Sequence, residues 1–249
     1  MKPRAFATIV FISTFMLLAY TSPSLGKTET GYTVTVYVTG FPSTYTTNVR
    51  VDQVWHGTIP GGGSKSFEFN ASTSHWITVD SYVTARPDTR YYCLLNLWRC
   101  SAGGTYTFTY TAQFYLTVKS PHSTTSGSGW YDAGTTAYAS IGSALTSGEA
   151  GTRYRFVGWI EDASGTSLVS NSILMDRPKI ANANWTTQYY LTVNTSPPEI
   201  KGTTGEGWYD AGTTATFSAS SPISGVAGQR YVFTHWIGDN GGASPASST

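Results

Sequence analysis

An internal repeat restricts the fold of this chain more than any other feature of its sequence. Three blocks recur in the same order and at nearly constant spacing. The matched blocks are Gln113–Val118 with Gln188–Val193, Gly129–Ala137 with Gly207–Ala215, and Arg153–Trp159 with Arg230–Trp236. Because each copy of a repeat folds as one supersecondary unit, we expect one β repeat at 113–187 and a second at 188–249.

The second repeat is truncated relative to the first. The counterpart of Ile173–Trp185 would begin beyond Thr249. A missing hairpin would leave an open sheet edge, so we expect the natural protein to continue past this point. The alternative is a natural protein that lacks the hairpin.

Strict alternation of residue types marks the strands of the first part of the chain. In Tyr32–Val38 and Thr105–Thr111, aromatic or aliphatic side chains alternate with threonine, as in half-buried antiparallel strands. No segment shows a sustained helical stripe. We therefore predict an all-β chain of tandem small antiparallel β-sheet or sandwich domains after an N-terminal signal helix. The first of these is an N-terminal β-sandwich domain at 27–112.

The N-terminal segment indicates export. Lys2 and Arg4 precede an uncharged apolar run, Ala5–Ala19, and a polar stretch ending at Gly26. This order is typical of a secretory signal peptide, which we place at 1–26. An uncleaved membrane anchor is the alternative, but the run is shorter than the roughly 20 residues that span a bilayer. The predicted location is extracellular or at the cell surface.

Export determines how the cysteines and asparagines are interpreted. Outside the cell, Cys93 and Cys100 are expected to form a disulfide that staples a short loop. Three Asn-X-Ser/Thr sequons, at Asn70, Asn184 and Asn194, are candidate glycosylation sites.

Charge and motifs argue against several function classes. The chain has 15 Lys+Arg against 14 Asp+Glu, and charged residues make up 12%. Such a surface offers no basic footprint for nucleic acid. Serine-hydrolase, zinc-protease and phosphate-binding motifs are absent from the sequence. We expect no catalytic residues, no cofactor and no metal, and hence a protein that is not an enzyme.

The repeated Gly-Trp-Tyr-Asp-Ala-Gly segment is the main site candidate. We assign Asp132, Gly134, Asp210 and Gly212 to structural turns, with aspartate accepting backbone N–H bonds and glycine supplying positive φ. Calcium binding at Asp132 and Asp210, or at Asp162 and Asp239, is the alternative. Four aromatic residues in the repeats are candidate platforms for glycan rings; they are Trp130, Tyr131, Trp208 and Tyr209. We expect Trp159, Trp185 and Trp236 to lie in the core.

Residues 113–249 resemble the divergent InlB B-repeat family of extracellular repeat domains. The likeness rests on Tyr190–Val193, on the two Gly-Trp-Tyr-Asp-Ala-Gly segments, on Tyr154–Trp159 and on Met175–Trp185. It implies compact β modules that serve as spacers or adhesive stalks, and it implies no catalytic residue. Residues 31–112 are similar to a PEGA-type surface domain at Val49–Pro60 and His75–Val79, although Gln53 stands where that family usually has glycine.

Together these observations predict a non-catalytic, secreted or cell-surface structural or adhesive repeat protein, such as a stalk, spacer or surface-layer component. A carbohydrate-binding module and the non-catalytic front end of an exported hydrolase are the alternatives. The expected partners are other surface proteins or glycans, with no nucleic acid. We also expect that such a chain can self-associate by pairing the exposed edges of its β-sheets.

Overall fold

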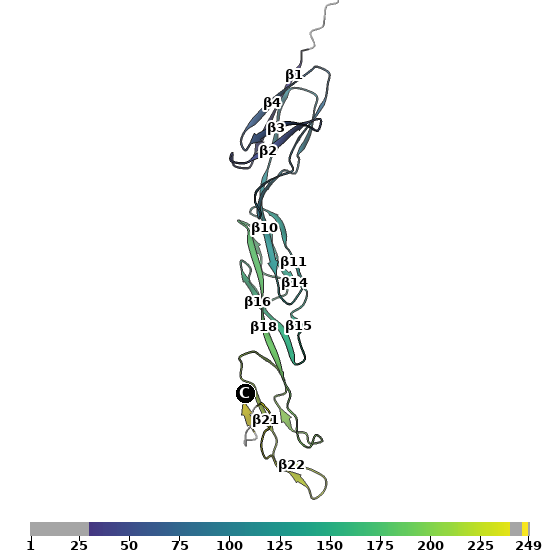
Figure 1. The fold of residues 1–249 in the computed structure, drawn as a ribbon, viewed down its shortest axis with the longest axis vertical. Coiled ribbons are helices and arrows are strands. Elements are labelled where there is room, and N and C mark those ends of the chain that lie inside the picture. The colour runs from purple at the N-terminus through teal and green to yellow at the C-terminus, as the bar shows by residue number, and fades with distance from the viewer. Residues whose placement is uncertain (1–29, 240–245, 249) are drawn as a thin grey trace, which may run out of the picture.

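The computed structural model describes residues 30–239 and 246–248, and within these ranges all regular elements are β-strands. Their sheets follow one another along a single long axis, with the N-terminal unit at one end and the second repeat at the other (Figure 1). The prediction of an all-β chain is confirmed, whereas the expected signal helix at 1–26 lies outside the described residues. In the described part of the chain, no helix is long and apolar enough to cross a membrane.

The N-terminal unit, residues 30–112, contains two sheets that share one core. The three-stranded sheet has the order β4 (Ser64–Phe69), β1 (Tyr32–Thr39), β9 (Gly104–Thr109). The four-stranded sheet has the order β3 (Val54–Pro60), β2 (Thr46–Val51), β5 (His75–Val79), β8 (Leu97–Cys100). The alternation along β1 buries Val34, Val36 and Val38 completely, against residues of both sheets.

Two pairs of strands run parallel, so the expectation of purely antiparallel sheets is wrong at these places. β1 pairs in parallel with β9, and β10 (Thr111–Lys119) pairs in parallel with β18 (Lys179–Leu191). In both pairs a long excursion through other strands separates the partners, which is the connection that parallel pairing needs. Period-two alternation identifies a strand and its buried face, but it is the same for either direction of pairing.

The largest sheet has eight strands and contains residues of the N-terminal unit and of both repeats. Its main path is β15–β16–β18–β10–β7–β6, while β12 pairs with β10 and β20 with β18. The bounds not yet given are β15 Leu145–Ser147, β16 Thr152–Glu161, β7 Thr89–Tyr92, β6 Tyr82–Arg86, β12 Gly129–Asp132 and β20 Gly207–Asp210. The boundaries predicted at 112/113 and 187/188 fall inside β10 and β18. No linker separates the sequence units at these points.

The first repeat packs a second core against one face of this sheet. Leu116, Phe156, Trp159 and Met175 are buried in it, and Trp185 packs against it partly exposed. Short two-stranded pairs complete the repeat; they are β11 (Thr125–Ser126) with β14 (Ser140–Ile141), and β13 (Thr136–Ala137) with β17 (Ile173–Leu174).

The described part of the second repeat has fewer buried apolar side chains than the first. Its buried apolar side chains among the described residues are Val193, Ala215 and Phe217, and Phe217 meets Trp236 edge to face at 4.8 Å. Its smaller sheets are β19 (Thr203–Thr204), β21 (Thr216–Ala219) and β24 (Ala246–Ser248), and the pair β22 (Ile223–Ser224) with β23 (Arg230–Tyr231).

Candidate functional site

The repeated Gly-Trp-Tyr-Asp segments form β12 and β20, each of which pairs with the strand that opens its own repeat. In the first repeat Asp132 lies opposite Gln113 and Trp130 lies opposite Tyr115. In the second, the same register places Asp210 opposite Gln188 and Trp208 opposite Tyr190. The sequence repeat is therefore also a repeat of strand pairing.

Each segment ends in a turn. The carbonyl oxygen of Asp132 accepts the N–H of Thr135 at 3.1 Å, and Gly134 has φ of +82°. The second copy matches, because Asp210 accepts from Thr213 at 3.0 Å and Gly212 has φ of +79°. The backbone carbonyl of the aspartate closes the turn, so the side-chain carboxylate can accept hydrogen bonds from other residues.

That carboxylate receives a hydrogen bond from a buried glutamine. Gln113 Nε2 donates to Asp132 Oδ1 at 2.7 Å, and Gln113 Oε1 accepts from Arg90 Nε at 2.7 Å. Gln113 is buried, so both ends of its amide need such partners. Arg90 belongs to β7 of the N-terminal unit. The amide thus connects the N-terminal unit to the turn of the first repeat.

The same two hydrogen bonds recur one repeat later. Gln188 Nε2 donates to Asp210 Oδ1 at 2.7 Å, and Gln188 Oε1 accepts from Arg153 Nε at 2.6 Å. Arg153 lies on β16, in the first repeat. In both places an arginine of one sequence unit is therefore linked through glutamine to the aspartate of the next unit.

Each arginine also covers the ring of the repeated tryptophan. The guanidinium carbon of Arg90 lies 4.4 Å from the ring centroid of Trp130, and that of Arg153 lies 4.4 Å from Trp208. A guanidinium at this distance over an indole face is a cation–π contact, worth about 0.5–1 kcal/mol or more when shielded from water. Both tryptophans are half-buried.

We call the two clusters the first joint and the second joint. The first joint is Arg90, Gln113, Trp130 and Asp132, and the second joint is Arg153, Gln188, Trp208 and Asp210. The second differs in that Arg155 also forms an ion pair with Asp210. In the first joint, Tyr92 takes the place of Arg155, because each of these two residues follows the shared triplet Thr-Arg-Tyr.

The sequence analysis singled out Trp130, Asp132, Trp208 and Asp210 but not their partners. The sequence does contain a pattern that could have identified the arginine partners, because the triplet Thr-Arg-Tyr occurs at 89–91 and again at 152–154. The two glutamines are also the first residues of the matched blocks. The contact itself could not be deduced, since Arg90 lies outside the repeat that it touches.

The remaining predicted residues lie apart from the joints. The hydroxyl groups of Tyr131 and Tyr209 donate to the carbonyls of Gly127 and Gly205, at 2.8 and 2.7 Å. The three sequon asparagines are exposed; Asn70 follows β4, Asn184 lies on β18 beside an open groove of about 540 Å³, and Asn194 follows β18.

The carboxylate of Asp162 is occupied by cations of the chain itself. Arg177 donates to Asp162 Oδ1 at 2.5 Å, and the ammonium of Lys179 lies 3.7 Å away. Among the described residues, no group of three or more histidine, cysteine, aspartate or glutamate side chains is arranged to hold a metal ion.

The predicted disulfide between Cys93 and Cys100 is wrong: both residues are free, buried thiols. Cys93 follows β7 of the eight-stranded sheet, and its N–H donates to Ser81 O at 2.8 Å. Cys100 ends β8 of the four-stranded sheet, opposite His75. The intervening segment passes from one sheet to the other, so the cysteines are anchored separately. Burial raises the pKa of both thiols.

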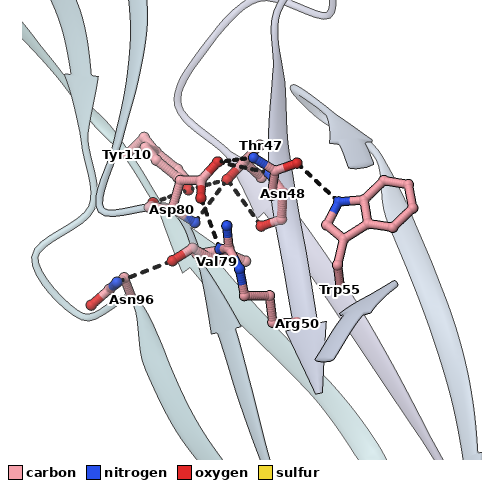
Figure 2. Close-up of polar contacts among 8 residues, drawn as sticks. All are labelled: Thr47, Asn48, Arg50, Trp55, Val79, Asp80, Asn96 and Tyr110. Carbon is pink, nitrogen blue, oxygen red and sulfur yellow. Dashed lines mark hydrogen bonds and ion pairs between the residues drawn. The ribbon is translucent and has the colours of Figure 1, made fainter. Parts of the chain in front are cut away.

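A polar network ties the N-terminal unit together around Asp80 (Figure 2). Asp80 Oδ2 accepts from the side-chain amide of Asn48 at 2.7 Å, and Oδ1 accepts from Arg50 at 2.9 Å. On the buried side, the Tyr110 hydroxyl lies 2.7 Å from Thr47 Oγ1 and donates to Asp80 O at 2.6 Å. Burial raises the pKa of Tyr110. The network fixes both the backbone at Asp80 and the side chains on the outer face.

Acid is expected to weaken the second joint. The hydrogen bond from Arg155, and after it that from Gln188, lowers the pKa of Asp210. A carboxyl whose pKa is lowered by folding stabilises the fold above its unfolded pKa of about 3.9, and this contribution disappears as pH falls through the folded value. The stability lost in Asp210→Asn, measured by urea unfolding, should therefore shrink as pH falls from about 5 to about 2. Arg155→Gln should reduce this pH dependence, and an effect of Asp210→Asn that is constant over the range would contradict the assignment.

Comparison with protein-family models, with curated proteins and with solved structures finds no match to this chain.

Proposed function

We propose that this chain is a rigid spacer, part of a non-catalytic structural protein that is secreted or displayed at the cell surface. The observation that carries the proposal is the pair of joints, in which consecutive sequence units share the same arginine, glutamine, tryptophan and aspartate contacts. A contact that repeats at each step keeps the same geometry from one unit to the next. This is how repeat proteins extend in one direction.

Continuous strands support the same function. β10 and β18 each cross a boundary between sequence units, and β18 does so over 13 residues. Bending at such a boundary would break ladder hydrogen bonds, whereas bending at a flexible linker would break none. The units therefore hold their directions, and the long axis in Figure 1 follows from this. The basic start and apolar run of 1–26 support export.

Small-angle X-ray scattering of the chain without residues 1–26 tests this function. A rigid spacer should give a pair-distance distribution with a maximum at the width of one unit and a long, nearly linear tail. The tail should persist at high ionic strength, because the glutamines of both joints are buried and the ladders of β10 and β18 that cross the boundaries carry no charge, so salt screens only part of each joint. A symmetric, bell-shaped distribution would mean that the units fold back on each other, and it would contradict the proposal.

A further inference from the structure

The outer face of the four-stranded sheet in the N-terminal unit is defined by the residues of β5 and β2 that point away from the core. Along β5, Ile77 and Val79 point into the core, so Trp76 and Thr78 point outward. The register places Arg50 opposite both Trp55 and Thr78, and thus on the same face. This outer face therefore displays two tryptophans and, opposite Thr78, the exposed side chain of Leu97, among small and polar side chains.

These two tryptophans are the most exposed of the eight in the chain. Trp55 is 63% exposed and Trp76 is 47% exposed. In contrast, an arginine lies 4.4 Å from the ring centroid of Trp130 and another 4.4 Å from that of Trp208, the rings that the sequence analysis selected as glycan platforms, whereas Arg99 lies 5.9 Å from Trp76 and leaves it 47% exposed. Large apolar rings left open to water on a folded protein mark interaction surfaces when they are grouped on one face.

The ring of Trp55 is held in place although it is exposed. Its indole N–H donates to Asn48 Oδ1 at 3.1 Å, and Asn48 in turn donates to Asp80 Oδ2 through its amide at 2.7 Å and its backbone N–H at 3.0 Å (Figure 2). Arg50 fixes the other oxygen of Asp80. A side chain that is already oriented loses little conformational entropy when a ligand binds to it.

The charges on this face compensate one another. Arg50 pairs with Asp80 at 2.9 Å. Asp52, in the turn between β2 and β3, accepts the backbone N–H of Trp76 at 2.8 Å and contacts the imidazole of His75, which lies on the inner side of the sheet, at 2.7 Å. Arg99 completes a balance of two arginines against two aspartates, and its guanidinium carbon lies 5.9 Å from the ring centroid of Trp76. An anionic partner would find no unpaired cationic cluster here. The charge balance therefore fits a neutral ligand.

We propose that this face binds a neutral oligosaccharide, with sugar rings stacked on Trp55 and Trp76. The C–H face of a sugar is apolar and suits an aromatic ring, while its hydroxyls suit planar polar groups. Arg50 and Asp80 provide such groups beside Trp55 and remain partly open to solvent. One strand separates the strands of the two tryptophans, so the rings lie roughly 10 Å apart across the sheet. One sugar ring cannot cover both, so the ligand is an oligosaccharide.

This binding role is separate from the joints and goes beyond the spacer function. Its test is isothermal titration calorimetry of the chain without residues 1–26 against four neutral hexasaccharides: cellohexaose, xylohexaose, mannohexaose and N-acetylated chitohexaose. We expect at least one of them to bind, and Trp55→Ala and Trp76→Ala each to weaken that binding about tenfold or more. Asn48→Ala should weaken it less and should increase the mobility of the Trp55 ring in fluorescence anisotropy.

Trp98→Ala is the matched control. Trp98 lies on β8 opposite the buried Ile77, and its side chain is therefore on the other side of this sheet. Its replacement should change affinity by less than about twofold. The proposal is overturned if none of the four hexasaccharides binds, or if binding survives in the double variant Trp55→Ala/Trp76→Ala. Tighter binding of hexagalacturonic acid than of every neutral hexasaccharide would overturn the choice of a neutral ligand.

Discussion

Replacing Gln188 by alanine is expected to lower the free energy of unfolding by about 2 kcal/mol. The side chain is 7% exposed, and both ends of its amide are used by Arg153 and Asp210. Alanine leaves the Nε–H of Arg153 without this acceptor, removes one donor from Asp210, and leaves a gap where the buried amide was. Urea titration followed by tryptophan fluorescence measures the change.

Two further variants show whether the loss of stability comes from the contacts of the second joint or from replacing any glutamine. Gln188→Glu keeps an acceptor for Arg153 but sets a second carboxylate against Asp210, so it should destabilise at neutral pH. Gln229→Ala removes an exposed glutamine and should stay within about 0.5 kcal/mol of the parent. If Gln188→Ala were as neutral as Gln229→Ala, the buried amide would not hold the second joint.

Gly127→Ala should destabilise the first repeat by roughly 3 kcal/mol or more. Gly127 has φ of +97°, and a Cβ added there would lie 2.1 Å from the carbonyl oxygen of Tyr138. The backbone must shift to admit the methyl group, and the shift would disturb the Gly127 carbonyl that accepts the Tyr131 hydroxyl. Differential scanning calorimetry should show a lower transition temperature.

Gly134→Ala is the control for this clash. Gly134 has a similar φ of +82°, but an added Cβ would meet no atom within 4 Å. The alanine variant should therefore lose only the free energy that a left-handed backbone costs a non-glycine residue, about 1–2 kcal/mol. If both variants lost the same free energy of unfolding, the clash with the carbonyl of Tyr138 would not contribute to the effect of Gly127→Ala.

The strands and their buried faces could be predicted from the sequence, because period-two alternation reports burial directly. Val34, Val36 and Val38 show this, since all three are fully buried along one face of β1. The repeat also pointed to the segments that pair as β12 and β20. In contrast, alternation carries no information about strand direction, so the parallel pairs β1 with β9 and β10 with β18 could not be foreseen.

The contacts between units could not be predicted from the sequence for a different reason. Arg90 covers Trp130 although the two residues belong to different sequence units, and only the fold brings them together. The disulfide was wrongly predicted because expected export, together with the short spacing of Cys93 and Cys100, favoured a staple across a loop. In the structure their connection passes from one sheet to another. The exposure of Trp55 likewise depends on which face of its sheet meets the core.

The central claim is that the joints hold consecutive units in fixed directions. Double electron–electron resonance tests it most directly, with spin labels at Ser43→Cys and Ser147→Cys across the first joint, and at Ser147→Cys and Ser224→Cys across the second. These serines are exposed, whereas the native thiols are buried and shielded from the label. We predict one narrow distance distribution for each pair, broadened across the first joint by Arg90→Ala and across the second by Arg153→Ala. A broad distribution in the parent chain, or one that both substitutions leave unchanged, would contradict the account.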